Sequence, residues 1–218
     1  MNLTRTERYA LAVLDAYGKS DALKKQERAI CLAISCIWEM WQAGAVTTDK
    51  KGRLIISAPL PEALSYCGPV YAQLAKKARK PEKAAYYCIW TSKRVKAMTK
   101  SVTDILIEKS ALVLEQPGGL AKASRCHVDN NLIENDLAAI KQPDEALTPD
   151  QLELAALLLE SRAVKKMLNK QQRNALKKAL RQTNNGFIDY LTKAMKLYWT
   201  DKALAWACVG SSAAGPLH

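Results

Sequence analysis

Apolar side chains fill residues 29–41 almost completely, and only Ser35 and Glu39 are clearly polar there. A helix that is apolar on nearly all sides has to be covered by other parts of the fold. The segment is also shorter than the roughly 20 residues that a membrane-spanning helix needs. The pattern therefore predicts the central helix of a protein core, with Gly44 as the signal that ends it.

A β-hairpin is predicted directly after this helix. Residues 46–48 and 54–56 are β-prone, and the segment between them has the composition of a turn. Further along, another predicted helix leads into the β-prone residues 111–115, which a Pro-Gly-Gly turn follows. The order of helix, strand and turn therefore occurs twice in the chain.

Helical spacing of apolar residues recurs through most of the remaining chain. The clearest start signal is Thr148-Pro149-Asp150-Gln151, which combines a Thr cap, Pro at the first position and Gln at the third. The other predicted helices are residues 3–14, 70–79, two helices on either side of Thr91-Ser92 within residues 83–114, and residues 131–141, 171–181 and 187–206.

Composition supports a helical fold, because 49% of the 218 residues are hydrophobic yet only one is Phe, and Ala and Leu dominate. We expect a mainly α protein in which residues 1–209 form a single compact multi-helix domain around a buried central helix, with short β-hairpins. Residues 210–218 are expected to form a disordered tail.

The six cysteines do not form the pattern of a disulfide set or a zinc site, because no two are spaced as CxxC. Several lie within apolar runs, and the N-terminal residues lack the features of a secretory signal. We therefore expect reduced and mostly buried thiols in a cytoplasmic protein. The cysteines are Cys31, Cys36, Cys67, Cys88, Cys126 and Cys208.

Positive charge is concentrated in two stretches of the chain, whose formal net charge is +12. Residues 71–100 contain nine Lys or Arg and one Glu, and residues 163–181 contain seven Lys or Arg and no acidic residue. The rest of the chain is slightly negative. Two local basic surfaces are therefore expected, and such surfaces favour partners that carry phosphate groups.

Four segments together resemble the Golgi phosphoprotein 3 family, helical domains that occur on eukaryotic Golgi membranes and in bacteria. The resemblance extends over most of residues 3–206, and it depends on the order and spacing of motifs that are each diffuse. In one of these motifs, Ser110 stands where the family usually has Gly. The segments are ERYALAVLDAYG (7–18), CIWEMWQAGAVTTDKKGRL (36–54), VTDILIEKSALVLEQ (102–116) and ALTPDQLELAALLLESRAVKKML (146–168).

The resemblance implies a peripheral membrane protein that binds phosphoinositide head groups. The family uses one Trp and three Arg for this purpose, and their positions correspond here to Lys24, Ala33, Lys96 and Thr99. The implied function is a non-enzymatic, adaptor-type protein on a cytoplasmic membrane surface, which binds anionic lipid and in addition a protein client. The candidate head-group-binding residues are Lys24, Lys25, Arg28, Lys93, Arg94, Lys96 and Lys100.

Other interpretations of the basic segments stay open. The lysines could form an ordinary solvated face. Residues 165–181 could instead form the recognition helix of a winged-helix DNA-binding regulator, although the apolar positions at helical spacing also fit a solvated amphipathic helix. Aromatic residues that would stack on nucleic-acid bases are absent from that segment.

Evidence for catalysis in the sequence is weak. No Walker loop, GxGxxG, GxSxG or supported Cys–His pair is present, so no enzyme activity, metal or cofactor is predicted. His127, Asp129, Glu134 and Asp136 could bind a metal, but a polar loop with helix-capping carboxylates is favoured. Glu39, within the central helix, is expected to form an ion pair or to cap a nearby amide.

Overall fold

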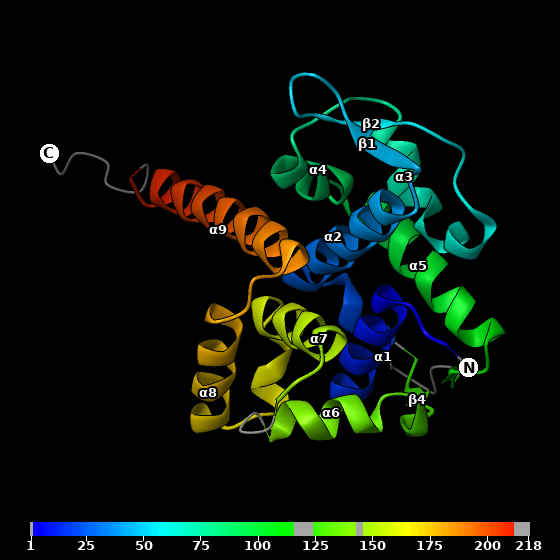
Figure 1. Ribbon diagram of the computed structural model, residues 1–218, viewed down its shortest axis with the longest axis vertical. Coiled ribbons are helices and arrows are strands. Elements are labelled where there is room, and N and C mark those ends of the chain that lie inside the picture. Colours follow the sequence, from blue (N-terminus) through cyan, green and yellow to red (C-terminus); the bar gives the residue numbers. More distant parts are fainter. Residues whose placement is uncertain (1, 116–123, 143–145, 212–218) are drawn as a thin grey trace, which may run out of the picture.

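The computed structural model describes residues 2–115, 124–142 and 146–211, and within these residues the fold is mainly α (Figure 1). The α-helices are α1 (Arg5–Tyr17), α2 (Gln26–Gln42), α3 (Gly68–Leu74), α4 (Pro81–Cys88), α5 (Ser92–Glu108), α6 (Glu134–Lys141), α7 (Pro149–Glu160), α8 (Lys170–Arg181) and α9 (Gly186–Ser211). Short 3-10 helices are η1 (Ala22–Lys24), η2 (Glu62–Cys67), η3 (Asn130–Leu132) and η4 (Ala163–Lys166). The strands are β1 (Val46–Thr48), β2 (Leu54–Ile56), β3 (Leu112–Leu114) and β4 (Cys126–Val128).

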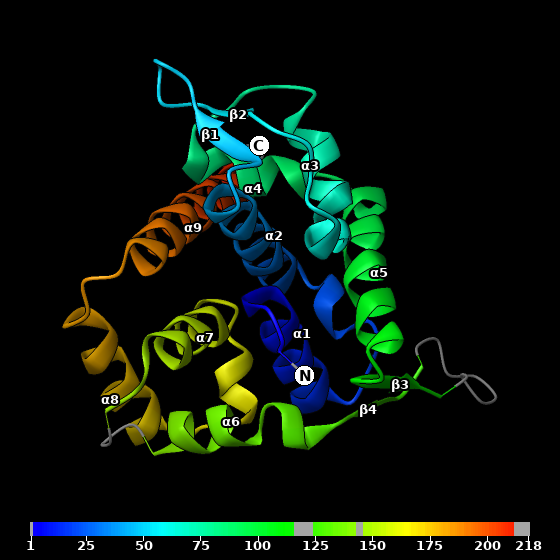
Figure 2. The same ribbon diagram turned by 45° about the vertical axis from the view of Figure 1, so that its right-hand side comes forward.

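The predicted central helix is α2, which six other helices surround (Figure 2). Helices α1, α3, α4, α5, α7 and α9 all contact it. Residues 29–37 of α2 are completely inaccessible to solvent. The prediction of a covered, apolar helix is therefore confirmed, and α2 organises the core on all sides.

Helix α1 has strong end signals on both sides. The Thr4 side chain caps its N-terminus and forms a capping box with Glu7. Gly18, with φ of 59°, ends the helix in the left-handed conformation. Glu39 on α2 supports the same N-terminus, because its carboxylate accepts hydrogen bonds from the Thr6 amide (2.9 Å) and the Thr6 hydroxyl (2.7 Å). The amide-capping interpretation of Glu39 is therefore confirmed.

Two helix–hairpin units form, and the sequence predicts all of their parts except the last strand of the second unit. Helix α2 leads into the antiparallel pair β1–β2, in which Val46 lies opposite Ile56. Helix α5 leads into the antiparallel pair β3–β4, in which Leu112 lies opposite Val128. The strand β4 was not predicted, since its short segment lies in a polar region and gains β structure only by pairing with β3. The Pro-Gly-Gly turn lies outside the described residues.

The helix predicted over residues 70–79 is shorter and begins earlier. Helix α3 starts at Gly68, contains Pro69 in its first turn and ends at Leu74. Proline fits there because the first amides of a helix have no intrahelical acceptor. The chain then turns, and the Arg79 carbonyl accepts a hydrogen bond from the Leu54 amide (2.6 Å), which ties this loop to strand β2. Pro81 begins α4 in the same manner.

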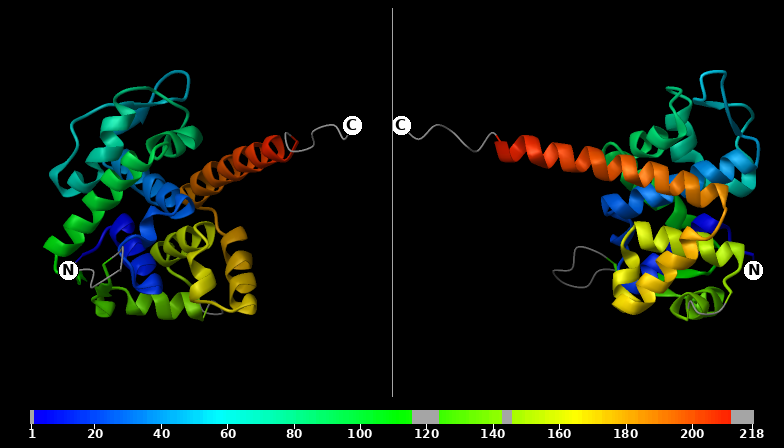
Figure 3. Two further views of the ribbon diagram at one scale, coloured as in Figure 1. Left: turned by 180° about the vertical axis from the view of Figure 1, so that it is seen from behind. Right: turned by 60° about the vertical axis from the view of Figure 1, so that its left-hand side comes forward.

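Helix α9 is longer than predicted and projects beyond the rest of the fold (Figure 3). It runs through Ser211, so residues 210 and 211 of the expected tail are helical, and residues 212–218 lie outside the described part. It packs against α2, α4 and α7. None of the described helices is long and apolar enough to cross a membrane.

Five cysteines are free thiols in the described structure. Cys31, Cys36, Cys67 and Cys88 are buried, and Cys126 is partly exposed. Burial raises the pKa of Cys88 to about 12 and that of Cys126 to about 11. The expectation of mostly buried, unpaired thiols is confirmed for these five. The structure describes the backbone of Cys208 but not its side chain.

Candidate functional site: a basic surface and an adjoining aromatic pocket

Several of the predicted head-group-binding residues lie on η1 and α5, two elements that contact each other. The side chains of Lys24 and Lys25 at the end of η1 are exposed, as are those of Lys93 and Lys96 on α5. Within the described residues, none of these four lysines forms an ion pair. We call this set the lysine surface. Lys100 is also exposed, but it forms an ion pair with Asp104 (2.6 Å).

Arg28 lies inside the protein, so the prediction that it belongs to the exposed basic surface is wrong. Its side chain is only 6% exposed. The guanidinium lies 3.5 Å from the centre of the Tyr17 ring and donates a hydrogen bond to the Ala22 carbonyl (2.8 Å). Arg28 therefore connects α2 with η1 and α1. Of the family positions, Ala33 and Thr99 are likewise buried.

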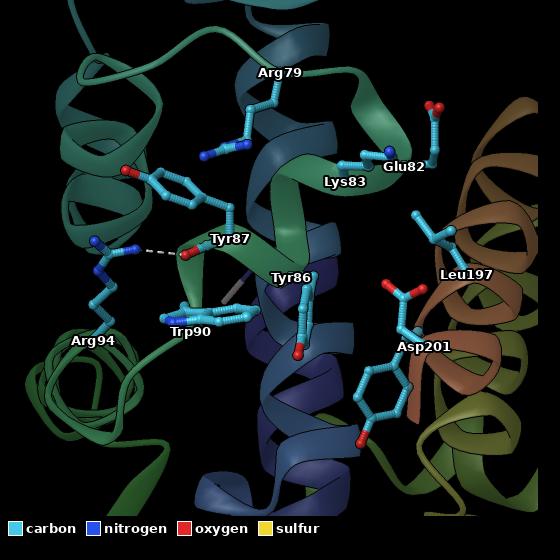
Figure 4. A pocket seen from close by; sticks show the side chains of 10 residues that line it. Arg79, Glu82, Lys83, Tyr86, Tyr87, Trp90, Arg94, Leu197 and Asp201 are labelled. Carbon is cyan, nitrogen blue, oxygen red and sulfur yellow. Dashed lines mark hydrogen bonds between the residues drawn. The ribbon is translucent and has the colours of Figure 1, made fainter. Parts of the chain in front are cut away.

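Arg94 lies at one side of a pocket and is half-buried. It donates a hydrogen bond to the Tyr87 carbonyl (2.7 Å), and its guanidinium lies 4.7 Å from the centre of the Tyr87 ring. The guanidinium of Arg79 lies 4.0 Å from the centre of the same ring. The side chains of two arginines distant in sequence therefore converge on one tyrosine (Figure 4).

The pocket has a volume of about 410 Å³ and lies between α4, the start of α5 and α9. Arg79, Tyr87 and Arg94 lie on one side, Leu197 and Asp201 of α9 lie on the other, and the rings of Tyr86 and Trp90 lie between them (Figure 4). Its remaining lining residues are Glu82, Lys83 and Tyr198.

Trp90 is unusually exposed for its size, with 65% of its surface accessible. Its ring packs edge-to-face against Tyr86, with 5.2 Å between the ring centres. Tyr86 in turn contacts Tyr198 on α9, at 6.0 Å between ring centres. The three rings form a continuous aromatic surface that connects α4 with α9.

Polar contacts hold α9 in place beside this aromatic surface. Lys202 donates a hydrogen bond to Glu27 at the start of α2 (2.9 Å), and Tyr198 donates one to Gln26 (3.2 Å). Burial is the largest single influence on the pKa of Glu27 and raises it, but the hydrogen bond from Lys202, a backbone hydrogen bond and the charges of Lys202 and Arg162 together lower this pKa. The hydrogen bond to Glu27 raises the pKa of Lys202. This ion pair therefore fixes the wall of the pocket that α9 contributes.

The second basic segment forms a solvated amphipathic helix. Leu176 is the buried residue of α8, whereas Lys170, Lys177, Lys178 and Arg181 are exposed. The Asn169 side chain caps this helix. Helix α9 follows α8 directly, so no hairpin comes after this basic helix, whereas hairpins follow α2 and α5.

The residues around His127 have structural contacts. His127 lies 2.9 Å from Glu115 in an exposed pair, and Asp129 accepts a hydrogen bond from the Asn131 amide (3.2 Å). Asp136 lies 3.6 Å from Arg8. No group of three His, Cys, Asp or Glu side chains within the described ranges could hold a metal ion. The capping interpretation is therefore confirmed for Asp129.

The sequence alone did not identify the pocket, because its residues come from segments more than 100 positions apart. The aromatic cluster Tyr86-Tyr87 with Trp90, close before Lys93-Arg94, is the one local signal that was available. The other wall of the pocket contains Leu197, Tyr198 and Asp201, and the sequence around them shows only the spacing of an ordinary helix. Neither a scan against protein-family models nor a search of curated proteins found a match for this chain.

Proposed function

We propose that this protein is a non-enzymatic, adaptor-type peripheral protein that binds anionic lipid head groups on a cytoplasmic membrane surface. The observation that carries the proposal is the lysine surface: Lys24, Lys25, Lys93 and Lys96 are exposed on two adjacent elements and have no acidic partner in the part of the chain that the structure describes. A solvated lysine near an anionic bilayer contributes roughly 1 kcal/mol to binding. Four lysines together therefore supply enough attraction for reversible docking.

Trp90 strengthens the proposal because it is an exposed indole two residues before the start of the lysine-bearing helix α5. Tryptophan favours the region of lipid head groups, where its ring and its N–H group both find suitable surroundings. A basic helix start with an adjacent exposed Trp combines electrostatic attraction with a shallow apolar anchor. Arg94 is half-buried and bonded to Tyr87, so we assign it a smaller share of the docking.

Co-sedimentation with vesicles tests this function. The protein is mixed with phosphatidylcholine vesicles with or without phosphatidylserine, at low and at physiological salt. We expect binding to the anionic vesicles alone, and weaker binding at high salt, because counterions screen exposed charges. Equal binding to both kinds of vesicle would contradict the proposal.

A charge-matched pair of variants locates the docking surface. Replacing the lysine surface (Lys24, Lys25, Lys93 and Lys96) by Gln is expected to reduce vesicle binding by about a hundredfold or more, since each lysine contributes roughly 1 kcal/mol. The control carries the same loss of charge elsewhere, with Gln at Lys165, Lys170, Lys177 and Lys178. An equal loss in both variants would show that net charge alone causes binding.

A mobility-shift assay with duplex DNA distinguishes the nucleic-acid interpretation. DNA binding would replace the membrane proposal if three results came together. The wild-type protein would retard DNA in a salt-dependent manner, the control variant with Gln at Lys165, Lys170, Lys177 and Lys178 (the α8 variant) would lose this retardation, and vesicle binding would be absent. We expect the wild-type protein and the α8 variant to behave alike in this assay.

A further inference from the structure

The pocket between α4, α5 and α9 holds positive charge that the surrounding protein does not neutralise. Arg79 and Arg94 lie 4.0 and 4.7 Å from the centre of one tyrosine ring, and neither forms an ion pair with any residue that the structure describes. The buried Nε atom of Arg79 has no hydrogen-bond partner among the residues that the structure describes. The two guanidinium groups lie on opposite sides of the Tyr87 ring (Figure 4), and a bound anion would stabilise two positive charges that no carboxylate of the described chain neutralises.

Arginine side chains favour phosphate among the common anions. A guanidinium offers several N–H donors in one plane and can bind two phosphate oxygens at once. Arg94 uses one donor for the Tyr87 carbonyl, which fixes the orientation of the remaining ones. Both guanidinium groups line the same pocket, so a phosphate at this wall is attracted by the charge of both.

Trp90 provides the surface for a flat ring next to this anion site. Its ring is 65% exposed although it lines the pocket, and Tyr86 supports it edge-to-face from within the protein. An exposed aromatic ring of this kind stacks on the ring of a bound molecule, and such stacking on a nucleic-acid base contributes about 1–3 kcal/mol. A bare inorganic ion would leave this surface unused.

The opposite wall contains the two carboxylates of the pocket, with Lys83 beside Glu82 (Figure 4). Asp201 on α9 and Glu82 on α4 line the side away from the arginines, with the aromatic rings between (Figure 4). Carboxylates accept hydrogen bonds from hydroxyl and amino groups and repel phosphate. The pocket is therefore polarised, with a cationic end for a phosphate and an acidic end for hydrogen-bond donors.

We propose that this pocket binds a nucleoside phosphate. The phosphate lies on Arg79 and Arg94, the base stacks on Trp90, and hydroxyl or amino groups of the ligand donate hydrogen bonds to Asp201. The volume of about 410 Å³ lies within the range of roughly 300–1,000 Å³ that is usual for small-molecule sites. The proposal shares Trp90 and Arg94 with membrane docking but does not rest on it, because Arg79, Tyr86 and Asp201 are not part of the lysine surface.

Calorimetric titration of the full chain tests the proposal with four probes. Adenosine monophosphate is compared with adenosine, with inorganic phosphate and with a soluble inositol phosphate. We expect the nucleotide to bind at least tenfold more tightly than either of its halves, since only the nucleotide engages both the arginines and the Trp90 ring. Absence of nucleotide binding, or equal binding of adenosine, would overturn the proposal. Tighter binding of the inositol phosphate would overturn it as well, and would assign the pocket to a lipid head group.

Substitutions locate the ligand within the pocket. Arg79→Gln and Arg94→Gln should each weaken nucleotide binding by about tenfold or more, because each removes charge-assisted hydrogen bonds. The matched control is Arg181→Gln on the exposed end of α8, which should leave the affinity unchanged. Equal effects of all three would contradict the assignment.

Substitutions of Trp90 test the site for the ring independently of the site for the phosphate. Trp90→Ala should weaken nucleotide binding by about 5- to 100-fold and leave the affinity for inorganic phosphate as it is. Trp90→Phe keeps an aromatic ring and should restore most of the affinity. Because Trp90 is exposed, both variants are expected to fold, and a thermal unfolding curve checks this. A loss of phosphate affinity in folded Trp90→Ala would overturn the division of the pocket into two ends.

Discussion

The two helix–hairpin units have the same backbone plan but opposite roles. Helices α2 and α5 both contain 17 residues, and each is followed by a residue with positive φ and then by a three-residue strand. The residues with positive φ are Gly44 and Ser110. Yet residues 29–37 of α2 are completely buried, whereas α5 presents Lys93, Lys96 and Lys100 to solvent. Local sequence signals therefore set the shape of each unit, and the packing around it determines whether it forms core or surface.

The arginine at the third position of each helix shows the same difference on a smaller scale. Arg28 and Arg94 each stack on a tyrosine ring and each donate a hydrogen bond to a main-chain carbonyl. The Tyr17 ring that Arg28 contacts comes from the core helix α1, so that arginine is enclosed. Tyr87 lines a pocket, so Arg94 has a side that a ligand can reach. Equivalent arginines thus have a structural role in one unit and a proposed binding role in the other.

The largest expected effect concerns the buried helix. Ile34→Ala in α2 should reduce the free energy of unfolding by about 2–5 kcal/mol, because the side chain is completely buried and its removal leaves a cavity. The corresponding test in α5 is Ile107→Ala, where the side chain is 42% exposed and the change should stay within about 0.5 kcal/mol. Chemical denaturation measures both, and equal losses would remove the distinction between the two helices.

A somewhat smaller effect is expected for the polar contact between α2 and α1. Glu39→Ala should lower the free energy of unfolding by about 2–4 kcal/mol, since it leaves the buried amide and hydroxyl of Thr6 without their acceptor. The control in α5 is Glu108→Ala, which replaces an exposed carboxylate and should have little effect. A Glu39→Ala protein as stable as wild type would show that these hydrogen bonds contribute nothing net.

The turn residues allow a test in opposite directions. Gly44→Ala should destabilise the protein by about 1 kcal/mol, because its φ of 74° disfavours any residue with a Cβ atom. An added Cβ would have open space there, so the backbone conformation alone causes the cost. Ser110→Gly, at φ of 56°, should stabilise the protein by about 0.5–1 kcal/mol. Thermal unfolding of the two variants should therefore shift the midpoint in opposite directions, and shifts of the same sign would contradict this explanation.

The smallest effect on stability is expected at the lysine surface. Lys93→Gln and Lys96→Gln should change the free energy of unfolding by less than about 0.5 kcal/mol, because both side chains are exposed and unpaired in the described structure. The same variants are expected to weaken vesicle binding. A clear loss of stability in either one would mean that this face of α5 is part of the fold rather than a docking surface.

Elements with strong end signals could be predicted from the sequence. The cap at Thr148 and the break at Thr91 both depend on residues within one turn of the helix end. The strand β4 could not be predicted, because it forms only by pairing with β3. The full length of α9 could not be predicted either, because the helix continues past the last residues with clear helical spacing of apolar side chains. The burial of Arg28 could not be predicted either, since its neighbours in sequence resemble those of an exposed lysine run.

The pocket was beyond sequence reasoning for a topological reason. Tyr86, Trp90 and Arg94 are close in sequence, and their cluster could be noticed, but Asp201 reaches them only because α9 packs across α4. The arginine of the loop before α4 was also hidden, since residues 70–79 had the spacing of a helix. These segments come together because of the way the helices pack around α2, and local sequence patterns do not predict that packing.

The contribution of α9 to the pocket has a consequence for how the protein matures. During synthesis, the wall with Arg79, Trp90 and Arg94 leaves the ribosome long before Leu197 and Asp201 do. A nascent chain therefore has only one wall of the proposed binding pocket until α9 is synthesised and forms the other wall. Ligand capture would then report that assembly of the whole chain is complete.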